Sequence, residues 1–336
     1  QPTSLFRIAS ISKPITAVAI LQLAEQKTLK LDDKVFEILN SENEIKAAGD
    51  KFDPRLREIT IRHLLEHRGG WDRNQSFDAM FQSVRFAKQV GVDAPADQTA
   101  VIKAMFSQKL DFNPGERYAY SNFGYCLLGR VIEKTSGQNY VDYVQNKVLA
   151  PIGITTMRIG ATRLDGRATK EVRYYQAGTG KSVFEADLDQ ETPHPYGAWN
   201  LESMDSHGAW IASAGDLAKF AAAFDDPNNC PILSYESIEL MYRRPPGLAG
   251  HAEDGSKKDV FYSLGWSNRV LKGGRINHWH TGSLPGTAAI LIRRHDGRNF
   301  VALLNCRISP SVNHLGRAID SLLHKAANQV TDWPTE

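Results

Sequence analysis

The sequence predicts an α+β protein, in which a mostly helical first two-thirds precedes an antiparallel sheet and a closing helix. Two segments, 14–28 and 122–134, repeat apolar residues with the period of a helix. Four strand-like runs separated by turn signals follow one another after residue 260. This order does not fit regular βαβ alternation. We therefore expect an antiparallel sheet flanked by helices, together with a mostly helical lobe.

The predicted helices carry signals for where they start or stop. Pro14 suits a first helical turn, Thr60 is a candidate N-cap, and Gly137 follows the apolar period that begins at Asn122. We predict helices at 14–28, 59–66, 122–134, 214–224 and 312–327.

The predicted strands are concentrated in the last third of the chain. Gly273-Gly274, Pro285-Gly286 and Asp296-Gly297 supply turns between apolar runs. We predict strands at 262–270, 276–280, 288–293 and 300–306, with shorter β-like pieces at 172–176 and 182–184.

The composition excludes several classes of function. Lys and Arg number 40 against 38 Asp and Glu, so the net charge is +2. A charge this small does not indicate a surface that binds nucleic acid or an anionic membrane. The most apolar run, 15–21, is far shorter than the roughly 18 residues of a membrane span. Cys126, Cys230 and Cys306 show no metal-ligand spacing, and we predict no cofactor. The first residues show no signal peptide, and the compartment stays open between periplasmic or secreted and cytoplasmic.

Ser10 and Lys13 form the first candidate catalytic pair. They lie three residues apart at the start of a predicted helix, so their side chains share one face. The free N–H groups and the positive dipole end of a helix N-terminus suit a developing oxyanion. A Lys beside the hydroxyl can favour the alkoxide, although an N-cap Ser and a solvated Lys would give the same spacing.

Tyr120 and Asn122 form the second candidate motif, at the mouth of a predicted helix. A phenol can relay protons, and an amide can hold a Lys together with a substrate carbonyl. The alternative to a catalytic role is that Tyr120 is a packed aromatic residue beside the N-cap of a helix.

The third candidate motif is His280-Thr281-Gly282-Ser283, at the end of a predicted strand. Gly282 would let a substrate approach the backbone, and the Ser283 N–H would serve as an oxyanion donor. The alternative is an ordinary strand end before a turn.

Together the three motifs resemble the serine β-lactamase and penicillin-binding-protein superfamily, whose pattern is S-x-x-K, Y-x-N and then K-T-G or H-x-G in this chain order. The resemblance to the class C-like branch extends over nearly the whole chain. It is carried by the blocks Phe6–Lys13, Ile61–His67, Pro114-Gly115, Tyr120–Tyr125, Gly129, Gly153, Gly215–Ala218, Leu264–Trp266 and His280–Gly282.

The resemblance implies a β-lactamase/transpeptidase-like fold and a serine hydrolase that works through an acyl-enzyme on an ester, amide or peptide. Ser10 Oγ would attack the carbonyl carbon, and Lys13 and Tyr120 would share the proton transfers. The backbone N–H groups of Ser10 and Ser283 would bind the oxyanion. Which of Lys13 and Tyr120 is the base is left open.

The remaining roles follow from the same resemblance. Asn122 would orient Lys13 and the substrate, and His280 would hydrogen-bond towards Tyr120 or the substrate. His280 stands where β-lactamases and many peptidases have a Lys that helps to hold a substrate carboxylate. Because a mostly neutral His holds a carboxylate less well, the departure favours an esterase or D-amino peptidase over an efficient β-lactamase.

The resemblance also divides the chain into two lobes with the active site between them. A sheet lobe of residues 1–30 and 205–336 would be interrupted by a mostly helical lobe of residues 31–204. Family members carry strands before the S-x-x-K segment, whereas Ser10 stands almost first in this sequence. We therefore expect an unpaired sheet edge, covered by strands of a longer parent chain or by a second copy in an oligomer.

Two other functions are weighed against this one. His63 and His67 fit the spacing H-x-x-E-H of a zinc hydrolase, and His278 and His280 would add ligands from one strand face. A non-catalytic, penicillin-binding-like scaffold is the second alternative. Turnover of a generic ester separates the scaffold from an enzyme, and loss of activity on chelation would indicate zinc.

Overall fold

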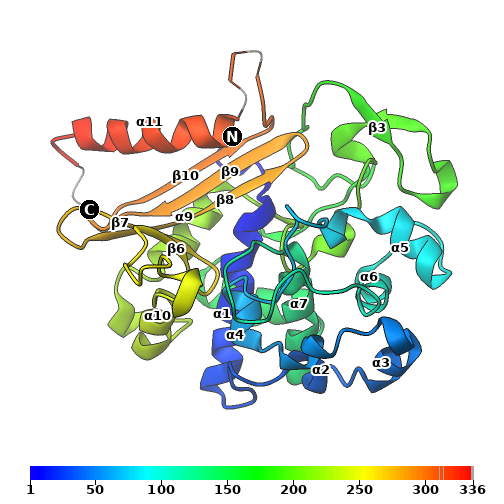
Figure 1. The fold of residues 1–336 in the computed structure, drawn as a ribbon. Helices are drawn as coiled ribbons and strands as arrows, with labels where there is room; N and C mark the ends of the chain where they lie inside the picture. The colour runs from blue at the N-terminus through cyan, green and yellow to red at the C-terminus, as the bar shows by residue number, and fades with distance from the viewer. Residues whose placement is uncertain (310, 313, 334–336) are drawn as a thin grey trace.

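Helix α1 (Ser12–Glu25) runs through the centre of the molecule (Figure 1). Every residue from Ser12 to Leu23 is buried, as expected for a helix that is apolar on all sides. The computed structural model describes residues 1–309, 311–312 and 314–333. The predicted sheet lobe of residues 1–30 and 205–336 includes positions 310, 313 and 334–336, which lie outside the described residues.

Helix α7 (Asn122–Ser136) packs against α1, and α4 (Ile61–Leu65) packs against α7. Both keep their predicted boundaries to within a few residues. The Thr60 hydroxyl accepts from the His63 N–H at the start of α4, and the Ser121 hydroxyl accepts from the Gly124 N–H at the start of α7. Gly137, with φ of 68°, ends α7 in the left-handed conformation. The other α-helices are α2 (Val35–Ile38), α3 (Glu42–Ala48), α4 (Ile61–Leu65), α5 (Ser83–Val90), α6 (Gln98–Met105), α7 (Asn122–Ser136), α8 (Tyr140–Tyr143), α9 (Ala214–Ala222), α10 (Tyr235–Met241) and α11 (Leu315–Gln329).

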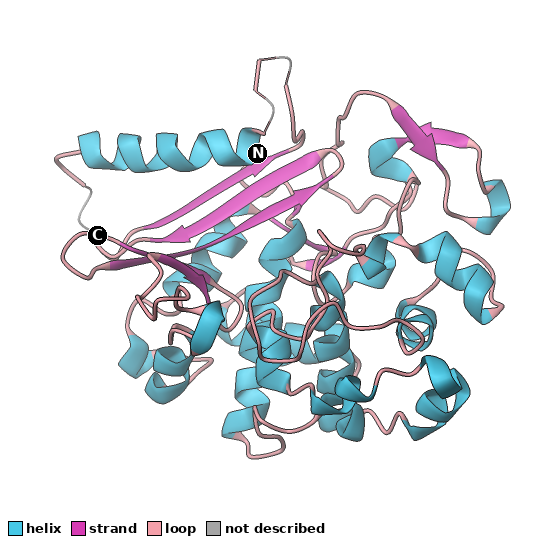
Figure 2. Ribbon diagram, viewed as in Figure 1, coloured by secondary structure: helices cyan, strands magenta, loops and turns pink. Residues whose placement is uncertain are grey.

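An antiparallel sheet in the order β10-β9-β8-β7-β6 forms the other layer. Helix α11 lies along one face of the sheet and α9 packs against the other, as Figures 1 and 2 show. The predicted α+β class is thus confirmed, whereas the division into two lobes at residues 30 and 205 stays a prediction. The strands are β6 (Val260–Tyr262), β7 (Ser267–Val270), β8 (Ile276–Leu284), β9 (Thr287–Arg293) and β10 (Asn299–Leu304).

The predicted strand 262–270 is broken into β6 and β7 by a tight turn. Gly265 has φ of 85°, and its N–H donates to the Ser263 carbonyl at 2.8 Å. A Cβ on Gly265 would lie 2.7 Å from the Ala17 side chain of α1. The turn therefore allows the sheet to approach α1. Because this contact joins residues far apart in the sequence, the local periodicity of apolar residues does not predict it.

The predicted β-like pieces at 172–176 and 182–184 are not strands. The regular structure there is a hairpin of β3 (Thr179–Lys181) and β4 (Glu191–Pro193), and Tyr175 forms an isolated bridge with Cys306. A small second sheet is made of β1 (Phe6–Arg7), β5 (Trp210–Ala212) and β2 (Arg158–Ile159).

Strand β10 is an edge of the five-stranded sheet: within the described residues it pairs with β9 alone, and all of its residues are half-buried. None of the helices in these residues combines the length and the apolar character that a membrane span requires.

Candidate active site

Ser10 lies in a single turn of 3₁₀ helix, η1 (Ala9–Ile11), directly before α1. The preceding Ala9 has φ of 48°, a strained conformation for a residue with a side chain. Such strain is common where a functional side chain must be aimed. The turn brings the half-buried Ser10 hydroxyl to the Lys13 amine, with 3.1 Å between Oγ and Nζ.

Lys13 is fully buried, and its Nζ has three oxygen atoms within hydrogen-bond distance. They are Ser10 Oγ, Asn122 Oδ1 at 2.8 Å and the His207 carbonyl at 3.0 Å. Burial lowers the pKa of Lys13 well below its usual value, and the negative charge of Asp78 partly opposes this. The neutral amine is therefore strongly favoured relative to an exposed lysine, and an amine of this kind is fit to accept the serine proton.

Tyr120 lies against the same amine. Its ring centroid is 4.8 Å from Lys13 Nζ and 4.8 Å from the Arg73 guanidinium, and 4.2 Å from the His67 ring. Burial raises the pKa of the Tyr120 phenol, with the neighbouring Ser10 hydroxyl acting in the opposite direction. Burial thus favours the protonated phenol and the neutral amine, so the two groups have different proton-transfer roles available to them.

Asn122 joins Lys13 to an acidic side chain that has no motif of its own. Its Oδ1 accepts from Lys13, and its Nδ2 donates to Asp78 Oδ2 at 2.7 Å. A guanidinium nitrogen of Arg73 lies 3.8 Å from the same carboxylate oxygen. The amide is therefore locked in one orientation by a titratable partner on each side.

Strand β8 runs beside the Ser10 turn and supplies the third motif. A Cβ on Gly282 would lie 2.0 Å from the Ile8 carbonyl oxygen, so this glycine makes room for the chain that carries Ser10. The expectation that Gly282 also lets a substrate approach the backbone stays a prediction. Ser283, one residue further, lines the same cavity as Ser10.

His280 bonds to a tyrosine that the sequence did not single out. Its Nδ1 lies 2.8 Å from the Thr281 carbonyl, which only accepts, so Nδ1 carries the proton and Nε2 accepts from the Tyr262 hydroxyl at 3.0 Å. Burial lowers the pKa of His280 to about 3. Both nitrogens are thus engaged away from Tyr120, whose ring centroid is 6.5 Å from that of His280.

A cavity of about 310 Å³ opens beside the nucleophile, and we call it the Ser10 cavity. A smaller cavity of about 110 Å³ lies on the other side of Asn122 and is lined by Tyr120 and Asp78. Arg73 and Asn122 border both cavities. The Ser10 cavity is lined by Ala9, Ser10, Arg73, Phe81, Asn122, Met204, His207, Gly208, Ser283, Leu284, Arg307 and His314.

Asp78, Arg73, His207 and Tyr262 were missed by sequence reasoning. Two of them, Arg73 and His207, line the Ser10 cavity. No spacing or motif marks the individual residues, because only tertiary packing brings them to the site.

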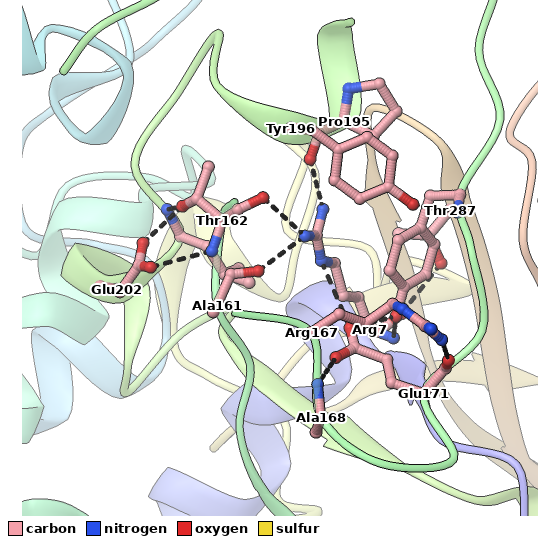
Figure 3. A network of polar contacts seen from close by, with 12 residues as sticks. Arg7, Ala161, Thr162, Arg167, Ala168, Glu171, Pro195, Tyr196, Glu202 and Thr287 are labelled. Atoms are coloured by element: carbon pink, nitrogen blue, oxygen red, sulfur yellow. Dashed lines mark hydrogen bonds and ion pairs between the residues drawn. The ribbon is translucent and has the colours of Figure 1, made fainter. Parts of the chain in front are cut away.

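Behind Ser10, the buried Arg7 of β1 holds the segment in place (Figure 3). Its guanidinium donates to the carbonyls of Pro195 and Ala161, each at 2.7 Å, and forms an ion pair with the buried Glu171 at 3.8 Å. The Thr287 hydroxyl of β9 donates to the Arg7 carbonyl at 2.9 Å. The strand before the nucleophile is therefore fastened both to the 160–200 segment and to the sheet.

The histidines of the H-x-x-E-H segment do not form a zinc site. Helix α4 ends at Leu65, and His67 follows with φ of 55°, so the two rings are not one helical turn apart. His63 Nδ1 accepts from the Thr60 N–H, and His67 Nδ1 accepts from the Ser121 N–H. No group of three His, Cys, Asp or Glu side chains within the described ranges is arranged to hold a metal.

Comparison with known proteins agrees with this geometry. A family described as Beta-lactamase matches residues 1–323, which confirms the resemblance drawn from the motifs. A penicillin-binding protein of Bacillus subtilis (strain 168) is 28% identical over 315 residues, which is 91% of this chain and 61% of that protein. The chain thus spans less than two-thirds of the length of this relative.

Solved structures give the same fold. An octameric penicillin-binding protein homologue from Pyrococcus abyssi superposes with a TM-score of 0.69 at 25% identity, over 96% of this chain and 67% of that chain. A D-amino acid amidase from Ochrobactrum anthropi SV3 superposes with a TM-score of 0.69 at 20% identity, over 98% of this chain and 85% of that one. The predicted β-lactamase/transpeptidase fold is confirmed.

Proposed function

This chain belongs to the beta-lactamase family, and we propose that it is a serine hydrolase that forms an acyl-enzyme on Ser10. The observation that carries the proposal is the buried contact of Lys13 Nζ with Ser10 Oγ and Asn122 Oδ1, at 3.1 and 2.8 Å. A buried amine paired with a serine hydroxyl is the arrangement that activates a nucleophile. Its substrate is a small ester, amide or peptide.

In the first step, Ser10 Oγ attacks the carbonyl carbon while its proton passes to the neutral Lys13 amine. The lowered pKa of Lys13 supports this assignment, since an ordinary lysine would already be protonated at neutral pH. The protonated Tyr120 phenol then gives its proton to the leaving group, whose bond to the carbonyl carbon breaks. The acylation step leaves a Lys13 ammonium and a Tyr120 phenolate side by side, and each stabilises the other.

The second step uses the charges that the first one creates. The Tyr120 phenolate takes a proton from water, the water oxygen attacks the acyl carbon, and Lys13 returns its proton to Ser10 Oγ as the ester bond breaks. The backbone N–H groups of Ser10 and Ser283 bind the oxyanion in both steps. A hole of this kind typically contributes about 10²–10³ in rate per donor.

The competing assignment is a non-catalytic, penicillin-binding-like scaffold. The strongest argument against it is the complete burial of Lys13, because removing an ionisable amine from water costs free energy and a scaffold would gain nothing from it. The absence of turnover with every activated ester, in a folded protein, would favour the scaffold.

The exposed edge at β10 supports a second part of the proposal, that another segment or a second copy pairs there. An unpaired edge is a template for strand addition, and the related protein from Pyrococcus abyssi is octameric. Light scattering that finds a monomer at all concentrations would contradict a self-association through this edge.

The test of the catalytic proposal is Ser10→Ala. We expect hydrolysis of p-nitrophenyl esters to fall by at least about 10³, because nucleophile and base act as a unit. Mass spectrometry should find an acyl adduct on Ser10 in the unaltered protein and none in the variant. The circular dichroism spectrum should be unchanged, since Ser10 makes no helix cap. Unchanged hydrolysis in Ser10→Ala contradicts the mechanism.

A further inference from the structure

The Ser10 cavity has an uneven charge distribution. The described residues that line it include two arginines, Arg73 and Arg307, and two histidines, His207 and His314, and none of them is a carboxylate. The cavity is therefore electropositive and rich in hydrogen-bond donors, which is unusual for a site that would take only a neutral alkyl ester. None of these four residues belongs to the motifs that carry the chemistry.

Arg307 is directed to this cavity by the course of the chain after β10. Its neighbours Cys306 and Ile308 line a different, more apolar hollow next to Tyr175, whereas Arg307 lines the Ser10 cavity. Side chains of an extended segment alternate in this way between its two sides. Among the described residues, no carboxylate forms an ion pair with Arg307, in contrast to Arg73, which faces Asp78.

His207 adds a buried polar group to the same wall. Only 2% of this residue is exposed, and its Nε2 has no hydrogen-bond partner among the described residues. A buried polar nitrogen without a partner costs free energy, and a rotation of the ring towards the cavity would let a bound ligand atom satisfy it. Burial also keeps the pKa of His207 well below its usual value, so the ring is neutral, with one N–H to donate.

The side of the nucleophile on which this cavity lies identifies the part of the substrate that it receives. Tyr120, which protonates the leaving group in the proposed mechanism, lines the smaller cavity and not the Ser10 cavity. The leaving group therefore departs on the Tyr120 side. The group that stays bound to Ser10 occupies the Ser10 cavity.

We propose that Arg307 and His207 form a subsite for a carboxylate carried by the acyl group of the substrate, with Arg73 at its border. The acyl donor is then the monoester or monoamide of a dicarboxylic acid, or an acidic residue whose carbonyl is attacked. A guanidinium binds a carboxylate through two parallel N–H donors, and the neutral imidazole supplies a third. The inference rests on the proposed function, since it assigns a substrate class to the same site.

The test compares two p-nitrophenyl esters of equal chain length, the pentanoate and the glutarate monoester. They differ in that a carboxylate replaces the terminal methyl group. After subtraction of spontaneous hydrolysis, we expect kcat/KM for the glutarate monoester to exceed that for the pentanoate by about tenfold or more at low ionic strength. The preference should shrink as salt is added, because screening weakens the ion pair.

The variant Arg307→Leu should remove the preference by lowering the glutarate value while leaving the pentanoate value within about twofold. Its pentanoate activity shows that the variant is folded. Arg275→Leu is the matched control, because this exposed arginine lies in the turn before β8 and its removal changes the net charge equally. His207→Gln, which keeps a hydrogen-bond donor, should retain part of the preference that His207→Leu loses.

The outcomes separate the two levels of the proposal. If both esters acylate Ser10 equally well, or if Arg307→Leu lowers both rates alike, the carboxylate subsite is wrong and the serine hydrolase stands. If neither ester is turned over and no adduct forms on Ser10, the proposed function fails and the subsite fails with it. If Arg275→Leu removes the preference as well, the effect is one of overall charge and the assignment to Arg307 is wrong.

Discussion

At the scale of single residues, the activity of Ser10 depends on how the pKa of Lys13 is set. Burial lowers this pKa, the negative charge of Asp78 raises it, and the positive charge of Arg73 lowers it. Asp78 reaches Lys13 through the amide of Asn122, which both of them hydrogen-bond. Asp78 and Arg73 belong to none of the motifs, and their opposite charges therefore move the pKa of Lys13 in opposite directions.

The pH dependence of hydrolysis should report this balance. When the neutral amine is the base, kcat/KM for a neutral ester rises with pH through the pKa of Lys13. Asp78→Asn removes a charge that raises the pKa, so the acid limb should move to lower pH. Arg73→Gln removes a charge that lowers it, so the limb should move to higher pH. The measurement is the pH profile of kcat/KM for each variant, and the two limbs should move to opposite sides of that of the unaltered protein.

The opposite signs make each variant a control for the other. The side-chain amide introduced by Asp78→Asn can still accept from Asn122 Nδ2, so the orientation of Asn122 is preserved while the charge is lost. A limb that stays in place in both variants, or moves in the same direction in both, would show that Lys13 does not titrate in the free enzyme.

The candidate nucleophile and its amine could be predicted because their relation is local. Ser10 and Lys13 are three residues apart on one helix turn, and the spacing alone brings them together. Asp78 and His207 could not be predicted as their neighbours. Their approach to Lys13 depends on tertiary packing and is mediated by one amide and one backbone carbonyl.

At the scale of elements, the close approach of β8 to η1 fixes the nucleophile. The hypothetical Cβ of Gly282 would meet the Ile8 carbonyl at 2.0 Å, and backbone cannot yield as a flexible side chain does. Gly282→Ala should therefore displace the segment that carries Ser10. We expect a loss of at least about 2 kcal/mol in the free energy of unfolding and of about 10²-fold or more in kcat/KM.

Gly215→Ala is the matched control for this change. Gly215 is in the first turn of α9, and the nearest heavy atom to its added Cβ would be 3.8 Å away. The substitution should leave activity unchanged and raise stability by about 0.5–1 kcal/mol, because alanine is the better helix former. Urea unfolding and ester hydrolysis measure both variants. A Gly282→Ala protein as stable and active as the Gly215→Ala protein would contradict the close packing.

The elements that sequence could predict are those with signals of their own. Thr60 and Ser121 cap α4 and α7, and Gly137 ends α7, so their bounds were predicted to within a few residues. The break between β6 and β7 depends on Gly265 meeting Ala17 of α1, which is a long-range contact. The alternation of apolar and polar residues near Gly265 therefore does not predict the break.

At the scale of the whole molecule, buried and half-buried histidines couple folding to pH. Burial lowers the pKa of His63 to about 4 and those of His278 and His280 to about 3, and it keeps the pKa values of His67 and His207 well below the usual one. The unfolded chain binds protons at these sites near pH 6.5, whereas the folded chain does not. The free energy of unfolding must then rise with pH between the lowered pKa values of the folded chain and about pH 6.5.

The free energy of unfolding should therefore fall steadily as the pH is lowered from about 6.5 to about 4, by up to about 1.4 kcal/mol per pH unit for each histidine that stays neutral in the fold. Glu66 opposes this trend weakly, since burial raises the pKa of its carboxyl.

His278→Gln keeps a donor for Asn268 Oδ1, which lies 2.7 Å from His278 Nδ1, and removes one titrating site. Urea unfolding across this pH range should give a shallower slope for His278→Gln, but not for the half-exposed control His251→Gln. Equal slopes in all three proteins would mean that His278 takes up its proton as readily in the folded chain as in the unfolded one, and that burial of this ring does not cause the acid sensitivity.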